Sequence, residues 1–259
     1  MRIAGPLFIV LLALMAIPLR ANDHSTWTAV LSQVVDARGF VDYDALLGDR
    51  AGFDGYVELV ENTGPATDPS KFPDSNSKLA FYINAYNALV FKGVLDRGPE
   101  RTSVWSGLIS GYNFFRRMKV KIDGQVTNLQ AIEDVLIRES FADPRVHAAL
   151  NCASVSCPRL PQTAFTAADL DTELNVAMYE FVNATQNVWI DDSRRTVYLS
   201  RIFDWFEDDF LEFEERTGST APSILNYINR FRTPGQEIPD KYKIRYLDYD
   251  KGINHQRRD

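Results

Sequence analysis

The clearest pattern of apolar positions in the chain lies between residues 78 and 95. Apolar side chains recur there every three or four residues, as on one face of a helix, at Leu79, Tyr82, Ile83, Tyr86, Leu89, Val90 and Val94. The opposite side is also apolar, and Gly98 followed by Pro99 ends the pattern. We therefore predict a long helix that lies buried at the centre of the fold.

Shorter patterns occupy the rest of the chain. Helical spacing predicts helices over residues 27–35, 127–136, 170–182 and 200–211, the second opening with a capping box of Thr127 and Gln130. Turn residues between apolar runs predict hairpins at 118–126 and 188–199, and short apolar runs predict strands at 146–150 and 243–248. Residues 62–77, rich in Pro, Ser, Asp and Asn, predict one long loop. This order predicts an α+β fold in which an antiparallel sheet packs against helices around the buried central helix.

The first residues differ in character from the rest. Arg2 precedes an apolar run over residues 7–17, and small Ala21 follows shortly after, a pattern typical of a secretory signal peptide. The run is shorter than the ~20 apolar residues that span a membrane. We therefore predict a signal peptide at residues 1–21, a single domain over residues 22–259, and export to the periplasm or the medium.

The charge of the chain excludes one class of partner. It has 35 Asp and Glu against 28 Lys and Arg, and removing residues 1–21 leaves 26 basic side chains. Nucleic acids are bound through clustered Lys and Arg, which an acidic protein lacks. We expect no nucleic-acid partner, no stable membrane span after signal removal, and a small-molecule or peptide-like ligand.

Two amides break the apolar pattern of the central helix. Asn84 and Asn87 are three residues apart and so share one face. Burying an amide without partners costs roughly 1 to 3 kcal/mol, so each must be bonded. They either brace neighbouring loop backbone or line a polar pocket and hold a ligand.

The segment at residues 145–160 contains both cysteines of the chain and His147. An exported protein would readily join Cys152 to Cys157 in a disulfide. A free thiol with a chemical role, a zinc site with His147 and inert buried thiols are the alternatives. If residues 146–152 formed one strand, His147 and Cys152 would lie roughly 16 Å apart, too far for a direct catalytic pair. No metal or cofactor is expected from the spacing of these residues.

An acidic, aromatic run follows at residues 204–215. Asp208 and Asp209 lie together on a segment that is otherwise rich in Trp, Phe and Leu. Such charges usually form a solvated helix face. One of them could instead orient an imidazole, as a carboxylate does in nucleophilic triads.

Several long motifs together resemble the domain of unknown function 547 family, over about residues 27–254. They are LAFYINAYNALV at 79–90, NLQAIEDVLIR at 128–138, PRVHAALNCASVSCPRL at 144–160, YLSRIFDWFEDDF at 198–210 and YLDYDKGIN at 246–254. The family looks related to the papain and transglutaminase type of fold. The resemblance implies a cleft beside the central helix, a histidine on a neighbouring strand and an orienting acid. At the position where such an enzyme carries a helix-borne cysteine, this chain has Asn84 and Asn87 nearby instead.

The resemblance supplies the candidate site residues. His147, Cys152, Cys157 and Asp209 are the catalytic candidates, and Asn84, Asn87, Glu133 and Arg138 are the ligand-binding candidates. One hypothesis is an envelope binding module or pseudoenzyme that kept the cleft. The alternative is a thiol-dependent hydrolase or acyltransferase in which His147 serves Cys152 or Cys157.

Overall fold

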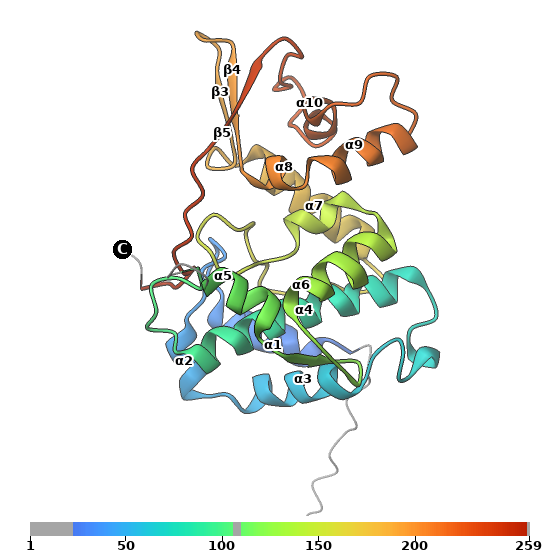
Figure 1. The fold of residues 1–259 in the computed structure, drawn as a ribbon, viewed down its shortest axis with the longest axis vertical. Helices are drawn as coiled ribbons and strands as arrows, with labels where there is room; N and C mark the ends of the chain where they lie inside the picture. Colours follow the sequence, from blue (N-terminus) through green and yellow to red (C-terminus); the bar gives the residue numbers. More distant parts are fainter. Residues whose placement is uncertain (1–22, 106–109, 258–259) are drawn as a thin grey trace, which may run out of the picture.

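The computed structural model describes residues 23–105 and 110–257 and has a mixed α+β fold (Figure 1). The predicted signal peptide, residues 1–21, lies outside the described residues. Helices α1 to α4 lie at one end of the molecule in Figure 1, and α8, α9, α10 and a three-stranded sheet lie at the other, with α7 between them. Among the described residues, no helix is long and apolar enough to cross a membrane.

The predicted central helix is confirmed as α4 (Ser75–Arg97). It begins three residues earlier than predicted, because Asp74 and Ser77 form a capping box there. Gly98 follows it with a φ of 92°, a conformation that favours glycine and ends the helix. Sixteen side chains of α4 are buried, as expected for a helix that is apolar on both sides.

Helices α1 (Ser25–Val34), α2 (Tyr43–Gly48) and α3 (Ala51–Asn62) pack around α4 at this end. The first was predicted, whereas the other two were not. The signal for α3 was present in the sequence, because its buried residues Phe53, Tyr56, Val57 and Val60 follow the helical period. The predicted loop after α3 is present and contains a short 3-10 turn, η1 (Pro69–Lys71).

The first predicted hairpin is confirmed between β1 (Val120–Ile122) and β2 (Gln125–Thr127). Asp123 and Gly124 both have positive φ, as its two-residue turn requires. The short helices α5 (Ser110–Tyr112) and η2 (Asn113–Arg117) precede the hairpin. The helix after it, α6 (Leu129–Ala131) continued by the π-helical η3 (Ile132–Glu139), is capped by Asn128 and not by the predicted Thr127, because the Asn128 side chain accepts from the backbone of Ala131.

The predicted strand at residues 146–150 is wrong. These residues belong to a 3-10 helix, η4 (Pro144–Ala148), followed by a turn. Asp143 caps η4 through the N–H of Arg145, and Pro144 occupies its first turn, where a missing N–H costs nothing. The roughly 16 Å separation expected between His147 and Cys152 rested on an extended strand and therefore fails with it.

The far end of the molecule contains α7 (Leu170–Asn183), β3 (Val188–Asp191), β4 (Thr196–Leu199), α8 (Ile202–Trp205), α9 (Glu207–Arg216), α10 (Ile224–Asn229) and β5 (Lys243–Tyr246). The second hairpin is confirmed, with Val188 opposite Leu199. The sheet is not wholly antiparallel, because β5 pairs parallel to β4 after the long crossover through α8, α9 and α10. The predicted helix over 200–211 is broken at Phe206, where α8 ends and α9 begins.

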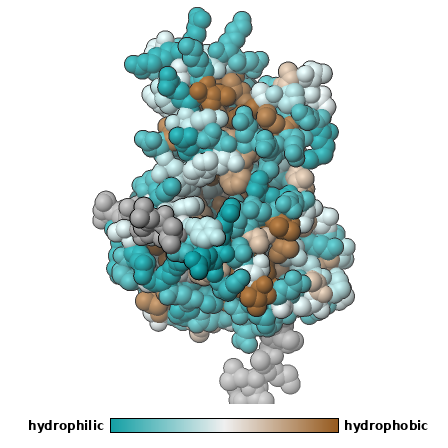
Figure 2. All heavy atoms as spheres, in the orientation of Figure 1, coloured by the Kyte–Doolittle hydropathy of each residue, from teal (hydrophilic) through white to brown (hydrophobic). Residues whose placement is uncertain are grey.

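Buried apolar side chains form two clusters, one at each end. The N-terminal cluster is built from α1 to α4 and the segments that follow them up to Leu174, with Ile253. The C-terminal cluster is built from Ala148 and the buried residues between Met178 and Ile238. Helix α7 supplies residues to both clusters, so it links them. The face drawn in Figure 2 is mostly hydrophilic, with hydrophobic side chains in separate patches.

Candidate functional site

His147 lies where the two clusters meet. Its neighbours Val146 and Ala149 belong to the N-terminal cluster and Ala148 to the C-terminal one. The imidazole is only 3% exposed and stacks on the ring of Phe206 with centroids 4.1 Å apart. The turn of η4 therefore holds this ring at the seam between the clusters.

Asp209 binds the imidazole from the first turn of α9. Its Oδ2 lies 2.7 Å from His147 Nε2. Burial lowers the pKa of His147, although the bond to Asp209 acts in the opposite direction, so the ring is neutral near pH 7. Since the carboxylate accepts, Nε2 carries the proton and Nδ1 keeps its lone pair. Nδ1 has no hydrogen-bond partner among the described residues.

Arg138 fixes Asp209 from the other side. Its Nε and Nη2 donate to the two carboxylate oxygens of Asp209 at 2.8 and 3.0 Å, and its Nη1 donates to Asp134 at 2.7 Å. Burial alone would raise the pKa of Asp209, but the bonds from His147 and Arg138 lower it well below the usual range. Asp209 is therefore an ionised orienting group.

Glu133 is the second polar group at the seam. Its Oε2 accepts from the hydroxyl of Tyr86 at 2.9 Å. Burial raises the pKa of Glu133 to about 7 despite that bond. The other carboxyl oxygen has no hydrogen-bond partner within the described part of the chain.

His147 and Glu133 line one cavity of about 120 Å³, which we call the seam pocket. Its polar or sulfur-bearing lining residues are Gln130, Glu133, His147, Cys152, Cys157, Tyr86 and Tyr249. Its apolar lining residues are Trp105, Phe115, Leu150, Pro158, Ile202, Trp205 and Phe206. The pocket is thus a small, mainly aromatic cavity with a few converging polar groups, the usual composition of a small-molecule site.

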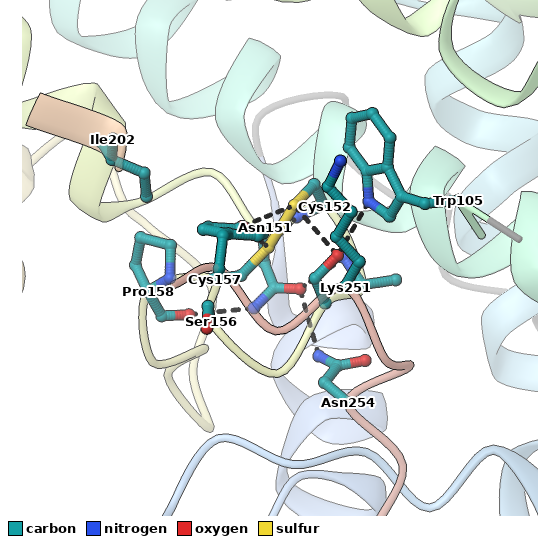
Figure 3. Close-up of a disulfide and its surroundings, with 12 residues drawn as sticks. Trp105, Asn151, Cys152, Ser156, Cys157, Pro158, Ile202, Lys251 and Asn254 are labelled. Carbon is teal, nitrogen blue, oxygen red and sulfur yellow. Dashed lines mark hydrogen bonds between the residues drawn. A yellow bond between two sulfur atoms is a disulfide. The ribbon is translucent and has the colours of Figure 1, made fainter. Parts of the chain in front are cut away.

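Cys152 and Cys157 form a disulfide at the wall of the seam pocket (Figure 3). Their Cα atoms are 6.2 Å apart, and neither cysteine is free. Trp105 and Lys251 lie on one side of the disulfide in Figure 3, and Ile202 of α8 faces it from the other. In this form of the protein neither sulfur can act as a nucleophile or bind zinc, because both reactions need a thiolate.

Residues 69–182 match the model of the family described as "Protein of unknown function, DUF547". The match covers less than half of the chain. No curated protein and no solved structure matches the chain. The relationship to the papain type of fold therefore remains a prediction.

The residues that match this family model supply only part of the seam pocket. Glu133, His147 and both cysteines lie within the matched residues. Trp205, Phe206 and Tyr249, together with the orienting Asp209, come from the segment that follows. The sequence after the DUF547 match is therefore needed to complete the site.

The two candidate amides do not line the seam pocket. Asn84 donates to the carbonyl oxygen of Phe165 and accepts from its N–H, at 2.8 and 3.0 Å. Asn87 donates to Ala149 and accepts from the N–H of Asn151, at 3.0 and 2.9 Å. With both ends of each amide bonded to backbone, we assign them a bracing role. Arg138 also lies outside the lining and acts through Asp209.

A buried polar network that the sequence did not indicate holds the disulfide loop. The side chain of Asn151 donates to Pro158 and accepts from Asn254, and Asn254 accepts from the hydroxyl of Tyr43. Figure 3 shows Asn151 beside the disulfide, between Pro158 and Asn254.

The sequence analysis also missed the pocket residues Trp105, Trp205, Phe206 and Tyr249, because single aromatic residues in a sequence are usually interpreted as core residues.

One group of possible metal ligands is found among the described residues, away from the seam pocket. Asp42, Asp44 and His255 have ligand atoms within 4.8 Å of one another. His255 Nδ1 accepts from the N–H of Arg257, which places the proton on Nε2, 3.0 Å from Asp44. The guanidinium of Arg257 also pairs with Asp44. Asp44 Oδ2 thus has two ion-pair contacts, although neither it nor His255 Nε2 forms a hydrogen bond of good geometry with the described residues.

Proposed function

We propose that this protein is an exported small-molecule-binding protein whose ligand occupies the seam pocket. The observation that carries the proposal is that His147 and Glu133 both line one aromatic cavity, while His147 Nδ1 and the second carboxyl oxygen of Glu133 have no hydrogen-bond partner among the described residues. Each of these atoms can form a hydrogen bond that the described residues do not supply, so a ligand or water in the cavity can complete its bonding.

The size of the pocket limits the ligand. A cavity of 150 Å³ is known to accept benzene, so a cavity of about 120 Å³ holds a compact group of similar size. Aromatic walls favour an apolar, planar body. Neutral His147 accepts a hydrogen bond, while Glu133, with a pKa of about 7, can donate or accept. The expected ligand is therefore a small ring with a hydroxyl or amide group.

The composition of the lining favours binding over nucleophilic catalysis. Among the described residues that line the seam pocket, none is serine, threonine or lysine, and both cysteines are paired. The orienting acid and the imidazole are in place, but the nucleophile of such a triad is not. This is the arrangement expected of a pseudoenzyme that kept an orienting pair for ligand recognition.

Two features support the exported location. The start of the sequence has the pattern of a signal peptide, and Cys152 is paired with Cys157. Disulfides persist in oxidising compartments and are rare in the cytosol. Mass measurement of the protein purified from the cell envelope tests this directly, through loss of residues 1–21 and of two hydrogens.

The binding proposal is tested with phenol and benzene, which differ by one hydroxyl. We expect phenol to bind five- to tenfold more tightly than benzene at pH 6.5, because its hydroxyl gains a hydrogen bond worth about 1 to 1.5 kcal/mol. Titration followed by ligand-observed NMR gives both dissociation constants.

Two variants test whether His147 and Glu133 cause the preference for phenol over benzene. His147→Phe keeps a ring against Phe206 and should reduce the preference for phenol to less than twofold, and Glu133→Gln tests the second group. Tyr179→Phe is the matched control, since Tyr179 is exposed and bonded to Thr233. Failure of both probes to bind, or a preference unchanged in both pocket variants, would contradict the proposal.

A further inference from the structure

The disulfide of the seam pocket is accessible as well as structural. Cys152 and Cys157 are both partly exposed, and both line the cavity. A small molecule in the pocket therefore lies against the sulfur atoms. Exposed disulfides are more readily reduced than buried structural ones.

Hydrogen-bond donors surround the two sulfurs unequally. Cys157 Sγ accepts from the backbone N–H of Cys152 at 3.0 Å and lies 3.2 Å from the hydroxyl of Tyr249. Cys152 Sγ lies 3.3 Å from the same hydroxyl and 3.7 Å from that of Ser154. Only Cys157 therefore receives a backbone donor that is fixed in place.

This asymmetry matters when the disulfide is opened. Hydrogen bonds to sulfur stabilise the charged thiolate more than the neutral disulfide, because a charged acceptor forms the stronger bond. In thiol–disulfide exchange, the sulfur that gives the more stable thiolate leaves faster. The donors therefore favour Cys157 as the leaving group and Cys152 as the sulfur under attack.

We propose that the seam pocket is a thiol–disulfide exchange site for small thiols, with Cys152 Sγ as the electrophile and Cys157 as the leaving thiolate. The thiolate of the incoming molecule forms a new S–S bond with Cys152 while the Cys152–Cys157 bond breaks. The electron pair of that bond remains on Cys157, where the N–H of Cys152 and the hydroxyl of Tyr249 bind it.

The mixed disulfide between Cys152 and the small thiol can react in two ways. Cys157 can attack Cys152 again and release the thiol, which restores the starting state. A second thiolate can instead attack the bound thiol's sulfur, which gives one small-molecule disulfide and a protein reduced by two electrons. The small thiol is thus the reductant, and no other co-reactant is needed.

The first experiment maps the attacked sulfur. Folded protein is mixed with 2-mercaptoethanol, quenched with acid, and digested for peptide mass spectrometry. We expect the adduct on Cys152, with a rate proportional to thiol concentration. An adduct mainly on Cys157, or a rate that equals the unfolding rate and does not depend on thiol, overturns the proposal.

The second experiment measures the asymmetry in single-cysteine variants. We expect the Cys157 thiol in Cys152→Ser to have a pKa at least one unit below that of the Cys152 thiol in Cys157→Ser, measured by thiolate absorbance against pH. Equal values would overturn the assignment of the leaving group.

Tyr249→Phe removes the hydroxyl donor and should slow exchange about fivefold, the effect of losing about 1 kcal/mol. Tyr246→Phe, in the same C-terminal segment but outside the pocket lining, should leave the rate unchanged. An equal effect of the two variants contradicts the role of the hydroxyl.

The exchange proposal uses the same pocket as the binding proposal but does not depend on it. Phenol binding with an unreactive disulfide would overturn only the exchange proposal. Exchange at Cys152 without phenol binding would overturn only the binding proposal.

Discussion

Burial shifts the pKa of the histidine and of the carboxyl that line the seam pocket in opposite directions. It lowers the pKa of His147 and raises the pKa of Glu133 to about 7. In both cases the neutral form is favoured, because a charge loses its hydration in the pocket. The site therefore presents a neutral acceptor and a carboxyl that is half-protonated near pH 7.

The burial of Glu133 predicts a pH-dependent loss of stability. Its carboxyl ionises near pH 4.5 in the unfolded chain and near pH 7 in the fold. The folded state therefore holds the extra proton between these values, and the free energy of unfolding falls as pH rises through them. The side chain in Glu133→Gln cannot ionise, so the free energy of unfolding of this variant should not fall in this way. Between pH 4.5 and 8, the wild type should lose about 2 to 3 kcal/mol more of its free energy of unfolding than the variant.

Urea unfolding of both proteins at pH 4.5 and 8 measures this difference. Glu139→Gln is the control, because Glu139 lies on the same η3 helix but is exposed. Parallel pH profiles of Glu133→Gln and the wild type would show that Glu133 is solvated.

At the scale of elements, the sequence predicts best where one period runs for many residues. Helix α4 was identified because its periodicity runs for many residues, and the two hairpins because turn residues separate short apolar runs. Residues 146–150 form too short an apolar run to distinguish a strand from a helical turn. The better signal was local, since Asp143 followed by Pro144 is typical of a helix start. The parallel pairing of β5 could not be predicted, because it depends on how the crossover packs.

The position of η4 and the disulfide loop depends on Asn87 of α4. Asn87→Ala would leave the carbonyl of Ala149 and the N–H of Asn151 unbonded and buried. We expect a loss of about 2 to 4 kcal/mol in the free energy of unfolding, measured in urea.

Asn76→Ala provides the comparison, since Asn76 is exposed in the first turn of the same helix, and should change stability by less than about 0.5 kcal/mol. If Asn87→Ala kept its stability but no longer bound phenol, Asn87 would be a ligand contact and not a brace.

At the scale of the whole molecule, the site could be predicted only in part. His147 and Asp209 were named as a pair from the resemblance, and the structure places them in contact. The cavity itself requires residues from Tyr86 to Tyr249 to converge between two separate clusters. Such convergence depends on how the clusters pack and has no local pattern in the sequence.

The stability of the whole molecule should depend on pH through groups in both clusters. Burial lowers the pKa of His24 from 6.5 to about 4, and it also lowers that of His147. A histidine with a lowered pKa destabilises the fold as pH falls below 6.5, because the unfolded chain then binds more protons. Glu133 acts in the opposite direction between pH 4.5 and 7. Burial also raises the pKa of Glu173, so Glu133 and Glu173 favour unfolding as pH rises, whereas His24 and His147 favour it as pH falls.

The effect of His24 is the most easily isolated, because His24 directly precedes α1 and does not line the seam pocket. Its Nδ1 is bonded to the hydroxyl of Tyr56, and its Nε2 is buried without a partner among the described residues. The shift in pKa corresponds to about 3 kcal/mol. As pH falls from 6.5 to 4, the free energy of unfolding should decrease by about 2 to 3 kcal/mol less in His24→Gln than in the wild type. Urea unfolding monitored by circular dichroism measures this difference. An unchanged pH profile would mean that His24 is protonated in the fold, with solvent reaching Nε2.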